Sequence, residues 1–157
     1  MPKSALHASR PSVRIVLDTS ALVSGFLWNG APRRLIEAAV AQRIEIFTSQ
    51  TLIAELERVS ARPKFAAKMM AQQLTPALLA ERYRAIAESV IPADIGPAVL
   101  TDPEDDHVLA CALAAQADLI VSGDPDLLNL KSYQGIPLVG TREALERIAQ
   151  SAKTAPT

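Results

Sequence analysis

Short strand-like runs alternate along this chain with longer segments of helical periodicity, and this order limits the fold more than any other feature. The strand-like runs are Val13–Leu17, Ile44–Thr48, 118–122 and Ile136–Val139. The segments between them carry apolar residues three and four positions apart, as one face of a helix requires. Alternating strands and helices favour parallel pairing through right-handed crossovers. The pattern predicts an α/β fold with three layers, α/β/α, around a central parallel sheet of four to five strands.

The expected helices have recognisable ends. Ser49 stands where an N-cap would precede a helix over 51–60, and Asp102 followed by proline is typical of a helix start. Residues 18–20 are predicted to form a polar turn that leads into a loop as far as Pro32. A brief edge strand is expected at 90–91. The other predicted helices cover 33–42, 64–73, 76–89, 103–116 and 141–151.

Length and composition fit one folded domain. The 157 residues are 49% hydrophobic, enough for one continuous core. We expect a tail over 1–12, the domain over 13–151 and a second tail over 152–157. The first tail lacks the apolar stretch of a secretory signal, and no apolar run approaches the ~20 residues of a membrane helix. A single cysteine, Cys111, excludes an intrachain disulfide, so we expect a soluble cytoplasmic protein.

Two aspartates follow strand-like runs directly. Asp18 ends the run Val13–Leu17, and Asp124 comes shortly after the run 118–122. Each aspartate alone is explained by a cap or a turn. The carboxyl ends of parallel strands meet at one edge of a sheet, where ligands of open α/β sheets bind. We therefore expect Asp18 and Asp124 to lie close together in a functional site.

Two further acids have helical spacing that turns them inward. Asp106 shares a helix face with Leu109, Ala110 and Leu113, whereas the other acids of 102–105 are explained by helix capping and the helix dipole. We favour Asp106 as the site residue, with Asp105 second. Glu55 shares a face with Leu52 and Val59, although a surface position would suit it equally. Oxygen ligands of this kind suit Mg²⁺ or Mn²⁺, and converging carboxylates would require such a cation.

Four segments in order resemble one known family. They are VLDTSALVSGFL at 16–27, SQTLIAELERV at 49–59 with RPKF at 62–65, DPEDDHVLACA at 102–112 and VSGDPDLL at 121–128. They resemble the PIN domain family, the nuclease domain named after the PilT N-terminus, and within it the VapC-like toxins of bacterial toxin–antitoxin systems. The likeness spans about 14–139. Ser20 stands where many members have Asn, and Ser122 where many have Thr, but both still form hydrogen bonds.

The resemblance implies a metal-dependent endoribonuclease whose catalytic and metal-binding residues are Asp18, Glu55, Asp106 and Asp124. Thr19, Ser20, Ser122 and Asp105 would support these ligands by hydrogen bonds. RNA would be the substrate and an antitoxin protein the partner. Two alternatives stay open, namely a PIN-like module that binds RNA or an antitoxin without cleaving, and a phosphotransfer domain with Asp18 as nucleophile.

A formal net charge of −1 gives the chain no general attraction for a phosphate backbone, so RNA would have to bind local patches. The candidate phosphate contacts are Arg33, Arg34, Arg62, Lys64 and Lys68. Trp28 is interpreted first as a packing or partner contact, with base stacking as the alternative. His107 is expected to be exposed and to stay outside the site. A predicted amphipathic helix carries Leu78, Leu79 and Ile86. These residues either pack in the core or form an interface with a second copy or an antitoxin.

Overall fold

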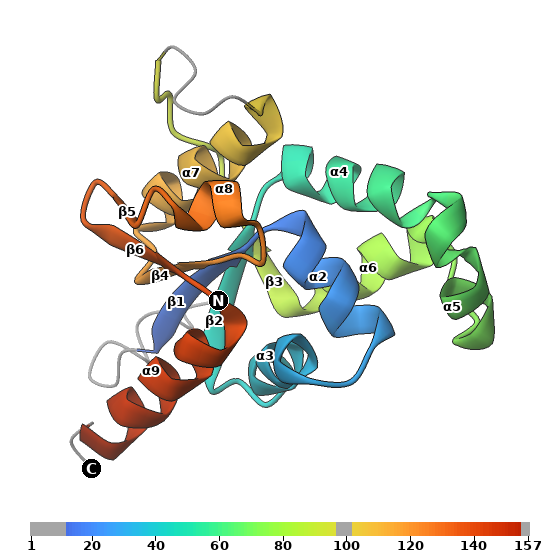
Figure 1. Cartoon of the computed structure of the whole chain (residues 1–157), viewed down its shortest axis with the longest axis horizontal. Coiled ribbons are helices and arrows are strands. Elements are labelled where there is room, and N and C mark those ends of the chain that lie inside the picture. The colour runs from blue at the N-terminus through green and yellow to red at the C-terminus, as the bar shows by residue number, and fades with distance from the viewer. Residues whose placement is uncertain (1–11, 97–101, 155–157) are drawn as a thin grey trace.

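The computed structural model describes residues 12–96 and 102–154, so all but the last residue of the predicted tail over 1–12 lies outside the described residues. A six-stranded sheet in the order β3-β2-β1-β4-β6-β5 forms the centre (Figure 1). Its strands are β1 Val13–Leu17, β2 Ile44–Thr48, β3 Ala87–Ser89, β4 Leu119–Val121, β5 Ser132–Tyr133 and β6 Ile136–Val139. All pairings are parallel except that of β5 with β6. The predicted α/β class is confirmed, and five of the strands form its parallel part.

Helices cover both faces of this sheet (Figure 1). They are α2 Thr19–Leu27, α3 Ala31–Val40, α4 Gln50–Ser60, α5 Ala66–Ala71, α6 Pro76–Ile86, α7 Pro103–Ala115, α8 Pro125–Leu128 and α9 Thr141–Thr154, with a 3₁₀ turn η1 at Pro63–Phe65. Among these described helices none is long and apolar enough to cross a membrane. Helix α9 continues past the predicted end at 151.

The core is divided by the sheet into two parts. Ile15 and Leu17 of β1 pack with α2, α3, α6 and α9, whereas Val16 between them packs with α7 and α8 on the other face. Successive side chains of a strand point to opposite faces, so a strand buried on both sides reads as a continuous apolar run. This arrangement confirms the three layers.

Two predicted helix starts are confirmed by their caps. The Ser49 hydroxyl accepts a hydrogen bond from the Leu52 amide at 3.3 Å, and Asp102 accepts one from the Glu104 amide at 3.0 Å. Each side chain satisfies an amide that has no partner within the first helical turn. Both helices, α4 and α7, thereby begin at defined positions beside the carboxyl edge of the sheet.

Three sequence expectations were wrong in detail. Helix α2 occupies the segment predicted as a turn and loop; most of its residues are apolar and buried, so the sequence shows little helical periodicity there. The edge strand lies at Ala87–Ser89 rather than 90–91, since α6 ends at Ile86 and the chain then pairs with β2. The two-residue strand β5 was not predicted, because such a short run has no measurable period.

Candidate functional site

A cavity of about 620 Å³ opens at the carboxyl edge of the sheet. The amino ends of α2 and α7, the turn at Asp124, the inner face of α4 and the η1 turn all contribute to it. Its acidic lining residues are Asp18, Glu55, Asp102, Glu104, Asp105 and Asp124, and its basic ones are Arg62 and Lys64. The remaining lining residues are Thr19, Ser20, Val23, Ser24, Trp28, Val59, Phe65 and Val108. Acids from four separate parts of the chain therefore face one space.

Asp18 lies where β1 ends and caps α2. Its Oδ1 accepts hydrogen bonds from the Ala21 amide at 2.9 Å and from the Ser20 hydroxyl at 3.1 Å. Its Oδ2 accepts one from the buried hydroxyl of Ser122. Burial, with 5% of the residue exposed, raises the pKa of Asp18, and these hydrogen bonds partly oppose that rise. The carboxylate is consequently held in one position.

Ser122 connects Asp18 to the second strand-end aspartate. The same hydroxyl that donates to Asp18 accepts a hydrogen bond from the Asp124 amide at 2.8 Å. Asp124 in turn caps the short helix α8 by accepting from the Asp126 amide at 2.9 Å. The negative charge of Asp124 also raises the pKa of Asp18. The two strand ends are thus brought together, as parallel pairing of β1 with β4 requires.

Glu55 enters the cavity from α4 and is 8% exposed. Its Oε1 is buried and makes no hydrogen bond in the part of the chain that the structure describes. Burial first, and then a hydrogen bond and charge repulsion from Glu104, raise the pKa of Glu55 to about 8. A Thr19 hydroxyl and the Arg58 charge oppose that rise. Burial and the Glu104 charge therefore favour the protonated form of Glu55 in the metal-free protein, whereas Glu104 favours its ionised form.

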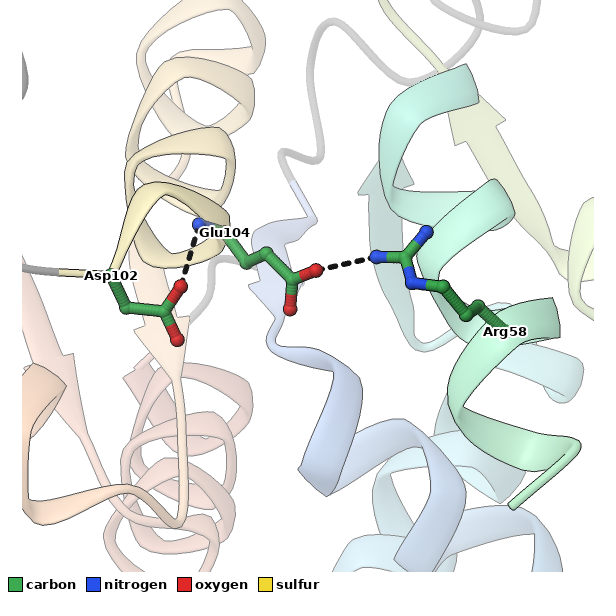
Figure 2. A network of polar contacts seen from close by, with 3 residues as sticks. All are labelled: Arg58, Asp102 and Glu104. Carbon is green, nitrogen blue, oxygen red and sulfur yellow. Dashed lines mark hydrogen bonds and ion pairs between the residues drawn. The ribbon is translucent and has the colours of Figure 1, made fainter.

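Glu104 is an acid of this site that the sequence reasoning assigned only to the helix dipole. Figure 2 shows its carboxylate reaching from α7 toward Arg58 of α4, with an ion pair at 2.5 Å. The hydrogen bond to Glu55 and the charges of Arg58 and Arg62 lower the pKa of Glu104. No local pattern reveals this contact, because α4 and α7 are far apart in the sequence.

The structure places the two neighbouring candidates, Asp105 and Asp106, in different surroundings. Asp105 lines the cavity, whereas Asp106 is buried and is not among the lining residues. Asp105 and Val108 lie on the face of α7 that lines the cavity. Asp106 shares its face of the helix with Leu109 and Ala110, which are buried. Burial and the nearby acids, Asp102, Asp124 and Asp18 foremost, raise the pKa of Asp105 to about 6. His107 is exposed, as expected.

The donor chemistry of the cavity fits a hard divalent cation, but the acids do not form a closed ligand group. Carboxylate oxygens are the ligands that Mg²⁺ and Mn²⁺ favour, and repulsion among Asp18, Asp105 and Asp124 is the kind that a cation relieves. Within residues 12–96 and 102–154, no three side chains of His, Cys, Asp or Glu lie close enough together to hold an ion. Coordination would require these carboxylates to move toward the ion.

Comparison with known proteins identifies the family of this chain. A family model described as a PIN domain matches residues 14–126, most of the chain and all the acids of the cavity. No curated protein matches the sequence. Members of the matched family are generally nucleases and generally bind divalent metals. The α/β fold, the acidic cavity and the match over 14–126 together place this chain in the PIN domain family.

Proposed function

We propose that the chain is an endoribonuclease that hydrolyses the phosphodiester bonds of RNA with Mg²⁺ or Mn²⁺. One observation supports this most, namely that Asp18, Glu55, Asp105 and Asp124 face a single cavity from four separate elements. A protein that only bound RNA would gain nothing from acids there, since carboxylates repel phosphates. An activity that needs a metal explains why repelling groups are gathered in one place.

We assign metal binding to Asp18, Asp105, Asp124 and Glu55, with Asp106 as the alternative to Asp105. A bound divalent ion would supply an activated water and would stabilise negative charge on the reacting phosphate. Ser20, Ser122 and the Ala21 amide orient Asp18 through the hydrogen bonds described above. Thr19 does the same for Glu55. The contacts of Asp18 hold its carboxylate in place, so coordination would mainly require the other carboxylates to move toward the ion.

The test is cleavage of a mixed RNA panel by purified protein with Mg²⁺, with Mn²⁺ and with EDTA. Asp18→Asn and Asp105→Asn are each expected to reduce kcat by about 100-fold or more, beyond the ~10- to 100-fold typical of residues that only orient ligands. Asp118→Asn is the matched control, because this exposed acid sits next to the opposite end of β4. Circular dichroism verifies that each variant is folded.

Asp106→Asn decides between the two neighbouring acids. If Asp106→Asn abolishes cleavage and Asp105→Asn does not, the assignment from the cavity is wrong and the one from helical periodicity is right. Cleavage that persists in EDTA, or in both Asp18→Asn and Asp105→Asn, would contradict the metal mechanism. RNA binding without cleavage under every ion would favour the binding module.

We also propose a toxin role in the bacterial cytoplasm, with an antitoxin protein as partner and a homodimer as the working form. This rests on the sequence resemblance to the toxin subgroup. In the structure Leu79 of α6 is buried in the core while Leu78 is 37% exposed, so only part of that helix is available to a partner. The toxin role predicts growth arrest on expression of the chain and none on expression of Asp18→Asn. The homodimer is tested separately by the mass in solution from light scattering.

A further inference from the structure

An aromatic pair forms one wall of the cavity. Trp28, the residue that ends α2, meets Phe65 of η1 edge to face, with ring centroids 6.0 Å apart and an angle of 68° between the rings. Both residues line the cavity, and Trp28 remains 38% exposed. An indole needed only for packing would be expected to be more deeply covered. A large aromatic surface is therefore offered to whatever enters the cavity.

Two lysines lie over these rings. The Lys68 Nζ is 5.5 Å from the centroid of Trp28, and the Lys64 Nζ is 5.1 Å from that of Phe65. Neither lysine belongs to an ion pair among the described residues. Arg62, which also lines the cavity, is the nearest further cation along the chain. This wall is positively charged, in contrast to the acidic wall around Asp18.

Helix α2 connects the two walls. Asp18 caps its first residue and Trp28 follows its last, so the two positions are about 15 Å apart at 1.5 Å for each residue. Ser20, Ser24 and Trp28 are four residues apart and line the cavity along one face of this helix. A span of ~15 Å corresponds to about four nucleotides at the 3.4 Å spacing of a duplex strand, and to fewer in an extended strand.

We propose that Trp28 and Phe65 form a stacking platform for an unpaired base of single-stranded RNA, with Lys64 and Lys68 on its phosphates, a few nucleotides from the scissile bond at the acids. The proposal rests on the proposed function, since it names the form of RNA that the site accepts. Bases within a duplex are already stacked and are not available to the platform. Stacking of a base is worth about 5- to 150-fold in affinity. The exposed cation–π contact of a lysine is worth about two- to fivefold, so a base can displace the lysine toward a phosphate.

Trp28 is the only tryptophan of the chain, so its emission reports on the platform alone. The experiment titrates the full chain in EDTA, at low salt, with a single-stranded RNA of about six nucleotides and with a hairpin that holds the same bases paired in a longer stem closed by a non-nucleotide linker, using labelled RNA anisotropy in parallel. Saturable quenching by the single strand and none by the hairpin stem are expected. Trp28→Leu should weaken binding at least about fivefold, whereas Trp28→Phe, which keeps a ring, should weaken it less.

The lysines are tested in the same titration against a matched cation. Lys64→Gln and Lys68→Gln should each weaken binding and reduce its salt dependence. Arg142→Gln, an exposed cation of α9 that does not line the cavity, should change neither. Unchanged emission at RNA concentrations that saturate the anisotropy would overturn the proposal, as would no binding at all, or equal affinity in Trp28→Leu.

The outcomes separate this proposal from the proposed nuclease function. Quenching without cleavage under any ion would refute the nuclease and leave the platform. Cleavage of single-stranded RNA with an unchanged KM in Trp28→Leu would refute the platform and leave the nuclease. A change of Trp28 emission with protein concentration alone, accompanied by a larger mass, would overturn the RNA proposal and assign the surface to a second copy of the chain.

Discussion

Replacing Glu55 by glutamine is expected to stabilise the metal-free protein above neutral pH while it impairs RNA cleavage. The reason is the environment of the Glu55 carboxyl, which is 8% exposed. Burial and the neighbouring Glu104 carboxylate both raise its pKa and favour its protonated form. Glutamine keeps the shape of the side chain and donates an N–H to Glu104 at every pH.

The sign and size of the effect follow from the pKa of Glu55. The pKa rises from 4.5 to about 8 in the folded protein, so protonated Glu55 stabilises the fold. This stabilisation is fully present below pH 4.5 and is lost as the pH rises through 8. At ~1.4 kcal/mol for each pH unit the rise corresponds to about 5 kcal/mol. The same contact lowers the pKa of Glu104 and offsets part of that loss. We therefore expect a gain smaller than about 5 kcal/mol, with a rise in Tm of roughly 2 to 4 °C for each kcal/mol in a chain of this size.

Thermal unfolding followed by circular dichroism in EDTA, at pH 5 and at pH 8.5, measures this difference. Glu55→Gln should unfold at a higher temperature than the unsubstituted chain at pH 8.5 and at nearly the same temperature at pH 5. Glu81→Gln, on an exposed position of α6, is the control and should shift neither. Equal or lower Tm of Glu55→Gln at pH 8.5, or the same gain at both pH values, would refute the reasoning.

Three further substitutions test the packing, each by the free energy of unfolding in urea. Gly25→Ala should destabilise the fold by about 1 kcal/mol despite its gain in helix propensity. The new Cβ would lie 2.8 Å from the Ile36 side chain and 3.0 Å from the Pro32 carbonyl oxygen. An unchanged urea midpoint would show that α2 and α3 can separate freely. Leu109→Ala removes a fully buried side chain of α7 and should lower stability by about 2 to 5 kcal/mol, and a loss below that range would mean that the core collapses around the gap. Arg147→Ala breaks only an exposed pair with Glu143 and should change stability by less than about 0.5 kcal/mol, so a larger effect would indicate an additional contact of α9.

The alternation of strands and helices could be predicted because burial on both faces of a sheet requires short continuous apolar runs, which are visible in the local sequence. Apolar runs at β1 and β4 and the caps at Ser49 and Asp102 depend on nearest neighbours in the chain, and the structure places them as predicted. Helix α2 could not be read in the same way. Most of its residues are buried and its polar face is limited to Ser20 and Ser24, too narrow to set a clear period, and it packs against α3 and α4.

The candidate site also could be predicted from the sequence only in part. That Asp18 and Asp124 meet at one edge follows from the sequence, because parallel strands carry their carboxyl ends together and each aspartate stands beside such an end. Which of the adjacent acids Asp105 and Asp106 lines the cavity depends on how α7 is rotated against the sheet, and only tertiary packing decides that. The approach of Glu104 to Glu55, which together with burial raises the pKa of Glu55, joins α7 to α4, and the wall of Trp28 and Phe65 joins α2 to η1. Spacing along the chain determines which residues share one element's face, whereas the meeting of different elements requires the folded core.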